Sequence, residues 1–487
     1  MKNPPLLLVI ILALALFLRV FRTADLMGFY YDQGRDALVV WDLVHHGKVF
    51  LIGPTTGIEG IFLGPFYYYL IAPFYALGGG NPVFPAVELA AINVLAIALL
   101  YYIGRLYFDQ ATGLLAVVLV TVSANLISAQ RWLSNPTPLP LFALLVLLAL
   151  LKIINGRPRW WLVLGLGTGL SLQLEAASAV FFLPTIFIVL LIHLRRVKFS
   201  PPHLLSAVAL FGATLLPQIY FDFRHGHILL HAFRQFLLSE KSFQPAVVGF
   251  LADRLNFYFV NFSNTLFITH TAAVVGFIIL GLLLLLFSLR LPRQAFVTLL
   301  VWWLTPMVIL LFYHGNHGYV WGYYFTGVYP VFILIASALG VAAFKKSPLM
   351  RPVLLLLLAL SLFQNVKQIK ADLFRPYPSV ISLTTSTAAV DWAYRDAAGT
   401  AFNIDAYVPP QIPYAYGYLT LWQGATVFHT QPQTALVPRL YTIYEPDLER
   451  PDYLQKWLAR QDSYGPVSAS THFGDVSVQR RTRISAP

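Results

Sequence analysis

The chain has 487 residues, of which 58% are hydrophobic and 11% are charged. An average soluble protein carries about twice that charged fraction, so the composition excludes an ordinary soluble fold. The formal net charge is +12, but the lysines and arginines lie mostly in short segments between apolar runs. That distribution is typical of membrane topology and not of nucleic-acid binding. The chain contains no cysteine, which excludes disulfides and thiolate chemistry.

Repeated apolar runs predict an all-α polytopic membrane protein with about 11 transmembrane helices, each near the length that a hydrocarbon core requires. The first run follows Lys2, and because no small-residue cleavage site comes after it we interpret it as a retained span. The predicted spans are residues 6–20, 84–102, 113–128, 138–154, 160–174, 177–194, 204–220, 266–289, 295–312, 322–344 and 353–363.

A long segment, residues 21–82, separates the first two spans. Within it, residues 34–46 show the periodicity of an amphipathic helix that lies in the plane of the membrane interface. The apolar run at residues 66–77 is too short to cross a bilayer comfortably. We expect this segment to form an outer loop that contains interfacial helices.

Charge predicts the orientation of the chain. With a cytoplasmic N-terminus, every inner loop carries an excess of lysine and arginine, as membrane topology demands. Most acidic residues before position 371 then fall on or near the outer side. We therefore expect a multi-pass protein of the cell membrane whose N-terminus is cytoplasmic.

The composition changes after about residue 370, where polar residues, proline and glycine become frequent. Residues 400–405 and 467–478 read as strands and residues 387–398 as a helix. We predict a transmembrane domain at residues 1–370 and a C-terminal soluble α/β domain at residues 371–487. An odd number of spans from a cytoplasmic start makes this second domain extracytoplasmic.

An acidic motif follows the first span at residues 30–36. Asp32 and Asp36 are four residues apart and share one face of a helix, with Arg35 between them. One interpretation makes Asp32 a catalytic carboxylate. The other is a solvated loop that caps a helix.

Further polar residues lie at the outer ends of predicted spans, where charge is costly and is a functional candidate by default. Arginine and histidine there favour binding of a lipid phosphate, and carboxylates favour binding of hydroxyl groups. The alternatives are an interfacial arginine that snorkels, an Asp–Arg pair that caps a helix and a glutamate in a solvated turn. These residues are Arg131, Glu175, Asp222, Arg224 and His225.

His314 and His317 are three residues apart, a spacing that metal sites use. No carboxylate is near them in the sequence, so we do not favour a metal site. Tyr319, Trp321 and Tyr323 follow, and such residues are usually an interfacial aromatic belt.

The pattern resembles the GT-C superfamily of polyprenyl-phosphate-sugar-dependent glycosyltransferases, and within it the family 39 group of protein O-mannosyltransferases and aminoarabinose transferases. The resemblance extends over residues 1–365 and rests on the acidic motif at 31–36, a Pro-aromatic stretch at 64–69, a Gln-Leu-acid element at 173–175 and the segment at 217–225. Two departures are Gln33, where the family usually has Glu, and Gly64, where it often has a charged residue or histidine.

The resemblance implies a donor sugar on a polyprenyl phosphate, an inverting transfer to a hydroxyl group, and Asp32 as the general base. The acceptor is a protein, a lipid or a glycan; membrane lipids are the other partners, and no cofactor is expected. The residues expected to bind substrate are Asp36, Arg35, Glu59, Tyr68, Arg131, Glu175, Asp222, Arg224, His225, His317 and Tyr324.

Two other classes of protein compete with this interpretation. A transporter or lipid flippase would carry acids and helix breaks at mid-membrane, whereas the acids here gather at one face. A receptor or assembly scaffold would not need an acidic cluster at the membrane surface.

Overall fold

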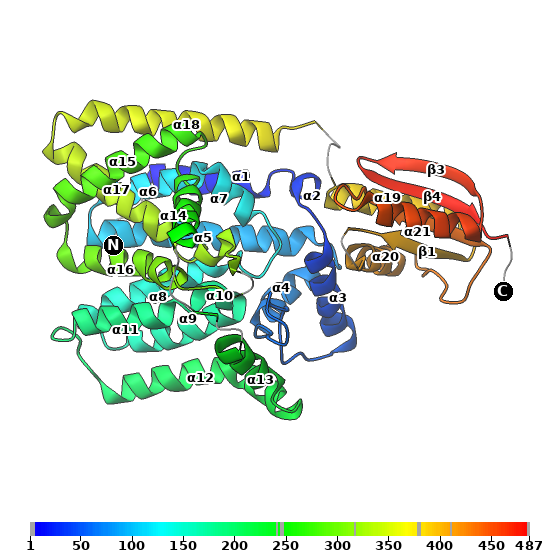
Figure 1. Ribbon diagram of the computed structural model, residues 1–487, viewed down its shortest axis with the longest axis horizontal. Coiled ribbons are helices and arrows are strands. Elements are labelled where there is room, and N and C mark those ends of the chain that lie inside the picture. The colour runs from blue at the N-terminus through cyan, green and yellow to red at the C-terminus, as the bar shows by residue number, and fades with distance from the viewer. Residues whose placement is uncertain are drawn as a thin grey trace.

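The computed structural model describes residues 5–239, 242–243, 248–315, 318–376, 381–409 and 412–484. Figure 1 shows a large bundle of helices, α1 to α18, and a smaller part from α19 onward that contains the strands. We call these the helical part and the C-terminal domain. The C-terminal domain lies at one end of the bundle, next to α2 and α3 (Figure 1), and we call that end of the bundle the domain-facing end.

The helical part consists of α-helices with short 3₁₀ and π turns between them. They are α1 (Leu6–Val20), α2 (Thr23–Leu26), α3 (Tyr31–His46), α4 (Phe66–Leu77), α5 (Val83–Tyr107), α6 (Gln110–Val122), α7 (Ala124–Gln130), α8 (Leu139–Ile154), α9 (Trp160–Leu174), α10 (Ala176–Ala179), α11 (Phe182–Ile192), α12 (Pro201–Arg224), α13 (Ile228–Arg234), η1 (Gln235–Ser239), α14 (Val248–Ser263), α15 (His270–Phe287), η2 (Ser288–Arg290), α16 (Arg293–Leu310), η4 (Gly322–Phe325), α17 (Tyr329–Lys346) and α18 (Met350–Leu373).

The structure confirms a multi-pass membrane protein but not the expected number of spans. Among the described residues, six helices are long and apolar enough to cross a membrane, or seven if α6 and α7, which meet at 68°, form one broken span. Other predicted spans are shorter helices: α1 and α9 have 15 residues each and α8 has 16. At about 1.5 Å per residue, such helices cover less than the roughly 30 Å of a hydrocarbon core.

Glycines bring α9 and α12 into close contact. A Cβ atom at Gly165 would overlap the backbone carbonyl of Ala207, and one at Gly169 would overlap the side chain of Thr214. Ala207 and Thr214 are the buried residues of α12, so the attachment of α12 depends on this contact. Small residues at helix crossings allow such close approach of two backbones in membranes.

The amphipathic helix expected at residues 34–46 is α3, which begins three residues earlier and therefore includes Asp32. Gln33 fixes its first turn, because its Oε1 accepts from the backbone N–H of Tyr30 at 3.1 Å and its Nε2 donates to the carbonyl of Leu133 at 3.1 Å. One side of α3 packs on α4, and another packs on α20 of the C-terminal domain.

The C-terminal domain has a four-stranded sheet in the order β1-β2-β4-β3. Strands β1 and β2 are parallel, whereas β2–β4 and β4–β3 are antiparallel. The helix α19 packs on β2, β3 and β4. The elements are α19 (Leu383–Ala397), β1 (Phe402–Tyr407), α20 (Tyr414–Thr426), β2 (Arg439–Tyr444), α21 (Pro451–Tyr464), β3 (Val467–Phe473) and β4 (Val476–Thr482).

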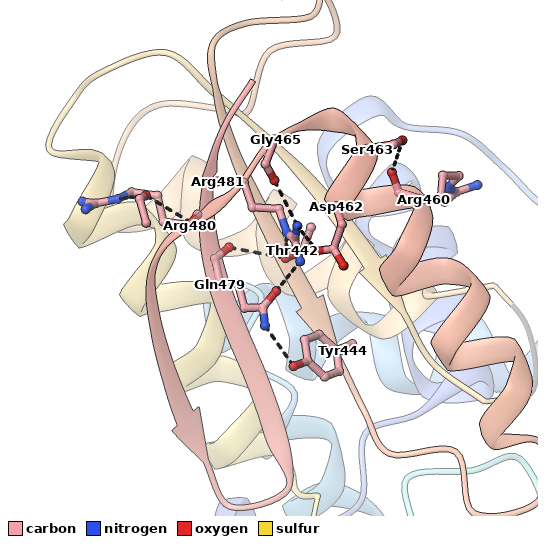
Figure 2. Close-up of polar contacts among 10 residues, drawn as sticks. Thr442, Tyr444, Arg460, Asp462, Ser463, Gly465, Gln479, Arg480 and Arg481 are labelled. Carbon is pink, nitrogen blue, oxygen red and sulfur yellow. Dashed lines mark hydrogen bonds and ion pairs between the residues drawn. The ribbon is translucent and has the colours of Figure 1, made fainter. Parts of the chain in front are cut away.

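A buried arginine ties the sheet to the end of α21 (Figure 2). Arg481 is 1% exposed and donates to Asp462 at 2.7 Å, to the carbonyl of Gly465 at 3.1 Å and to Gln479 at 2.6 Å. Gln479 in turn donates to the hydroxyl of Tyr444 at 3.1 Å. Because protein groups occupy this guanidinium, we assign the cluster a structural role.

The contact between α9 and α12 leads to a first prediction. Gly165→Ala should lower the free energy of unfolding by about 1–3 kcal/mol, because the added methyl group forces two packed backbones apart. Gly212→Ala, on α12 itself, is the matched control, since a Cβ at Gly212 meets no atom within 4 Å. Thermal unfolding in lipid nanodiscs measures both; equal melting temperatures for the two variants would contradict the packing described.

Candidate functional site

Arg35 joins two carboxylates in the first turns of α3. Its Nη1 lies 2.9 Å from Oδ1 of Asp32, and its Nη2 lies 2.8 Å from Oδ1 of Asp36. The side chain of Asp32 is 61% exposed and that of Asp36 only 6%. The hydroxyl of Tyr68, on α4, donates to Oδ1 of Asp36 at 3.1 Å. The fold therefore gathers four of the predicted site residues, with one carboxylate open to solvent and the other buried.

Burial raises the pKa of Asp36 to about 6, while the neighbouring guanidinium of Arg35 opposes that rise. The buried carboxylate is therefore ionised at neutral pH and pairs with the guanidinium. This pairing holds Arg35 in place beneath Asp32.

Glu175 marks a second group, at the break between α9 and α10. Its side chain accepts from the backbone N–H of Ala177 at 3.1 Å and from Nδ2 of Asn135 at 3.2 Å. Glu175 is 7% exposed, and burial raises its pKa to about 7. The carboxylate thus caps α10, and it is also held close to its charge transition at physiological pH.

The tyrosines of η4 lie near the carboxylates. Burial raises the pKa of Tyr323 well above its usual range, and the charges of Glu175 and Asp32 raise it further. Both carboxylates therefore lie within electrostatic reach of one phenol. Tyr324, which the sequence also predicted, shares a side-chain hydrogen bond with Tyr313 and feels the charge of Glu175.

Arg254 and His314 lie beside these tyrosines, and the sequence did not predict that they form a pair. Arg254, on α14, is 6% exposed and donates through Nη2 to the carbonyls of Tyr313, at 3.2 Å, and Gly318, at 3.0 Å. Its guanidinium lies 4.8 Å from the ring centroid of Phe250, and the ring of His314 stacks on Phe250 at 4.0 Å.

Both of these side chains have nitrogen atoms available for a ligand. Within the part of the chain that the structure describes, Nε of Arg254 and Nε2 of His314 are buried without a hydrogen-bond partner, and Arg254 forms no ion pair. An unpaired buried guanidinium is costly, and an anion bound there would offset that cost. The sequence signal was an arginine in the segment between two predicted spans, which spacing alone does not connect to His314.

Other predicted site residues lie apart from Asp32. Arg131 donates to the carbonyls of Leu18 at 2.9 Å and Phe21 at 2.6 Å, and so holds the end of α1. Glu59 is exposed in the loop between α3 and α4. His317 lies outside the described residues.

The end of α12 forms a separate group. Asp222 accepts from the backbone N–H of Leu229 at 2.7 Å and therefore caps α13. It lies 3.3 Å from Nδ1 of His227, so its partner is a histidine and not the arginine of the Asp–Arg pair considered from the sequence. Arg224 is exposed, and its guanidinium lies 5.8 Å from the ring centroid of Tyr220. Nδ1 of His225 lies 2.8 Å from the carbonyl oxygen of Phe221.

The two departures from the expected motifs have structural reasons. A side chain at Gly64 would overlap Gln173, whose Oε1 accepts from the backbone N–H of Phe66 at 3.0 Å. Gln33 donates to a carbonyl, which an ionised glutamate cannot do. Among the described residues, no group of three histidine, aspartate or glutamate side chains is placed to hold a metal ion.

Residues 63–221 match the sequence pattern of the family described as dolichyl-phosphate-mannose-protein mannosyltransferase. The solved structure of ArnT from Cupriavidus metallidurans bound to undecaprenyl phosphate superposes with a TM-score of 0.62 over 97% of each chain, at 11% identity. The chain has the GT-C fold of the protein mannosyltransferase and ArnT type. The resemblance stated from the sequence is therefore confirmed, and the C-terminal domain is included in the superposition.

Two further structures share this fold. The oligosaccharyltransferase AglB from Archaeoglobus fulgidus, solved with an inhibitory peptide and a dolichol-phosphate, gives a TM-score of 0.50 at 15% identity over 99% of this chain and 74% of that one. The arabinofuranosyltransferase AftD from Mycobacteria gives 0.53 at 12% identity over 100% and 40%. No curated protein sequence matches this chain closely enough to count as a relative.

The buried Asp36 leads to a second prediction. Its pKa of about 6 in the folded state exceeds the value of about 3.9 in an unfolded chain. At a pH between these two pKa values, the Asp36 carboxyl is protonated in more of the folded molecules than of the unfolded ones, and this proton binding stabilises the folded state. That contribution to stability is present below about pH 4 and is lost as the pH rises through about 6. The stability of the wild type relative to Asp36→Asn should therefore be greater at pH 4.5 than at pH 7.5. Unfolding measured at both pH values tests this; a difference that does not change with pH would contradict it.

Proposed function

We propose that the protein is an integral membrane glycosyltransferase that moves a sugar from a polyprenyl-phosphate donor to a hydroxyl group of an acceptor, with inversion. The observation that carries the proposal is the exposed carboxylate of Asp32, held by Arg35 at the domain-facing end of a GT-C fold. The structures with this fold that were solved with undecaprenyl phosphate and with a dolichol-phosphate support the class of donor.

Asp32 acts as the general base. A base must reach the proton that it removes, and the side chain of Asp32 is open to solvent while its Oδ1 is fixed by Arg35. The acceptor oxygen forms a bond to the anomeric carbon as the bond from that carbon to the phosphate oxygen breaks. The acceptor proton passes to Asp32, and the polyprenyl phosphate leaves.

Arg254 and His314 bind the departing phosphate. The charge that develops on a leaving phosphate is stabilised best by donors already in place, and both side chains have an unpartnered nitrogen in the described structure. Arg224 and His225, both exposed at the end of α12, are second contacts for the donor as it enters from the lipid. No metal ion takes part in this mechanism.

The remaining polar residues position substrate hydroxyl groups. Glu175 and Tyr324 lie within electrostatic reach of each other and beside the ring that also senses Asp32. Asp36 pairs with Arg35 and accepts from Tyr68, and Glu59 is exposed in the loop between α3 and α4. In the membrane we place the N-terminus in the cytoplasm and the site and C-terminal domain outside, as the distribution of lysine and arginine favours.

Replacement of the base is the third prediction. Asp32→Asn should lower kcat for transfer by about 10²–10⁴-fold and leave donor binding unchanged, because general-base catalysis contributes about that much. Asp42→Asn is the matched control: Asp42 lies near the C-terminal end of the same helix and pairs with His46 and Lys48, away from the site. Transfer is measured with purified protein, a panel of polyprenyl-phosphate sugars, and both variants with and without EDTA.

Full transfer by Asp32→Asn would contradict the assignment of the base. Loss of transfer in EDTA would contradict a metal-independent mechanism. Movement of the donor lipid across the bilayer without any turnover would favour a flippase over a transferase.

The phosphate site gives the fourth prediction. Arg254→Met should lower kcat/KM for the donor by about 10²–10³-fold, because it removes a preorganised donor to the leaving group. Arg351→Met is the control, since Arg351 is exposed and donates to the carbonyl of Phe344. Binding of the polyprenyl phosphate alone should weaken in the same variant. If that affinity is unchanged while the protein stays folded, the phosphate is held elsewhere.

A further inference from the structure

Three aromatic rings form a series in the segment that leads into α17. Tyr319, Trp321 and Tyr323 alternate with buried Val320 and with Gly322. Trp321 has an extended backbone (φ −95°, ψ 147°) and Tyr323 lies in the first turn of η4, and the ring of Trp321 stacks with those of both tyrosines. We call these three rings the aromatic ladder.

The rings of the ladder are nearly parallel and evenly spaced. The centroids of Tyr319 and Trp321 are 6.2 Å apart with planes inclined by 21°, and those of Trp321 and Tyr323 are 6.4 Å apart with planes inclined by 11°. All three rings are partly exposed, so part of each ring is open to a ligand. In an interfacial aromatic belt each ring inserts into the lipid separately, so a common orientation of the three rings is not required.

The ladder runs from open surface to the candidate site. Exposure falls from 64% at Tyr319 to 50% at Trp321 and 39% at Tyr323. The inner ring, Tyr323, is the one that feels the charges of both Asp32 and Glu175. The element that carries Tyr323, η4, packs on α10, so a molecule laid along the ladder has one end near Glu175, which caps α10.

The chemistry of the ladder favours an uncharged saccharide. Residues 318–325 contain no charged side chain. The face of an aromatic ring is electron-rich and attracts the slightly positive C–H groups on one face of a sugar ring. Phenol hydroxyls and an indole N–H at the ring edges can bond to sugar hydroxyl groups.

We propose that the ladder is an acceptor subsite, and that the acceptor is an uncharged saccharide chain or saccharide head group whose terminal hydroxyl reaches Asp32. This inference rests on the proposed function and names its acceptor class. The outermost ring, Tyr319, then contacts the sugar unit farthest from the bond that forms. Trp321 contacts a unit closer to the base.

The test measures binding of neutral hexose oligosaccharides of one to six units to the full chain in nanodiscs, by saturation-transfer NMR and calorimetry. Affinity should rise with length up to about three units. Trp321→Ala should weaken binding of disaccharides and longer chains at least tenfold. Tyr319→Ala should weaken only trisaccharides and longer chains. Tyr453→Ala, an exposed tyrosine on α21, is the control and should bind as the wild type does.

Trp321→Phe keeps an aromatic face and should retain most of the affinity, which separates stacking from a folding defect. A lipid-linked form of the same saccharide is tested beside the free one, and stronger binding of the lipid-linked form would identify a glycolipid head group. The inference is overturned if no saccharide binds, or if Trp321→Ala binds as the wild type does. It is also overturned if the ladder variants alter only thermal stability in nanodiscs, the result expected for an aromatic belt, or if a serine or threonine peptide accepts sugar equally well with and without the ladder.

Hydrolysis of the donor by water, measured without any acceptor, separates this inference from the proposed function. If the donor is hydrolysed in an Asp32-dependent way while the ladder variants bind saccharide normally, the acceptor subsite fails and the transferase function stands. If ladder-dependent saccharide binding is found but no donor is consumed, the transferase function fails and the saccharide site stands.

Discussion

The ion pair of Arg35 with Asp36 is the constraint on which the rest of the site depends. Asp36 is nearly inaccessible to solvent, and it receives the guanidinium of Arg35 and the hydroxyl of Tyr68. Removing one partner of a buried pair leaves an uncompensated charge, so the fold holds Arg35 firmly in this position. The second arm of Arg35 then fixes the orientation of the exposed carboxylate, Asp32. A base must be held within reach of the proton that it removes, and the contact with Arg35 supplies this positioning.

The helix that carries this pair is held from two sides, which explains why the C-terminal domain lies where it does. A Cβ at Gly34 would overlap the backbone of α20 at Ala415, so the two helices touch. The hydroxyl of Tyr418 and the indole N–H of Trp422, both on α20, donate to backbone carbonyls at the start of the segment that leads into α5. In Figure 1 the domain meets the bundle at α2 and α3. We infer that the domain contributes to the precision of the site, whichever acceptor it also contacts.

The sequence predicted the parts of this arrangement that are local. The four-residue spacing of Asp32 and Asp36 gave the helical motif, and Tyr68 came from the stretch that follows Gly64. The contacts that the sequence did not predict are tertiary: Arg254 meets His314 across the ring of Phe250, and Arg131 donates to the end of α1. The number of spans could also not be predicted from the apolar runs alone, because packing decides where a helix breaks, as it does between α6 and α7.

A structure of Asp32→Asn in nanodiscs with a polyprenyl-phosphate sugar would test the central claim most directly. The account predicts the phosphate in contact with Arg254 and His314, and the anomeric carbon close to the amide that replaces the carboxylate of Asp32. The acceptor hydroxyl would approach from the side of Tyr323. Density for the sugar away from position 32, or for the phosphate at a site that leaves Arg254 unoccupied, would contradict the account.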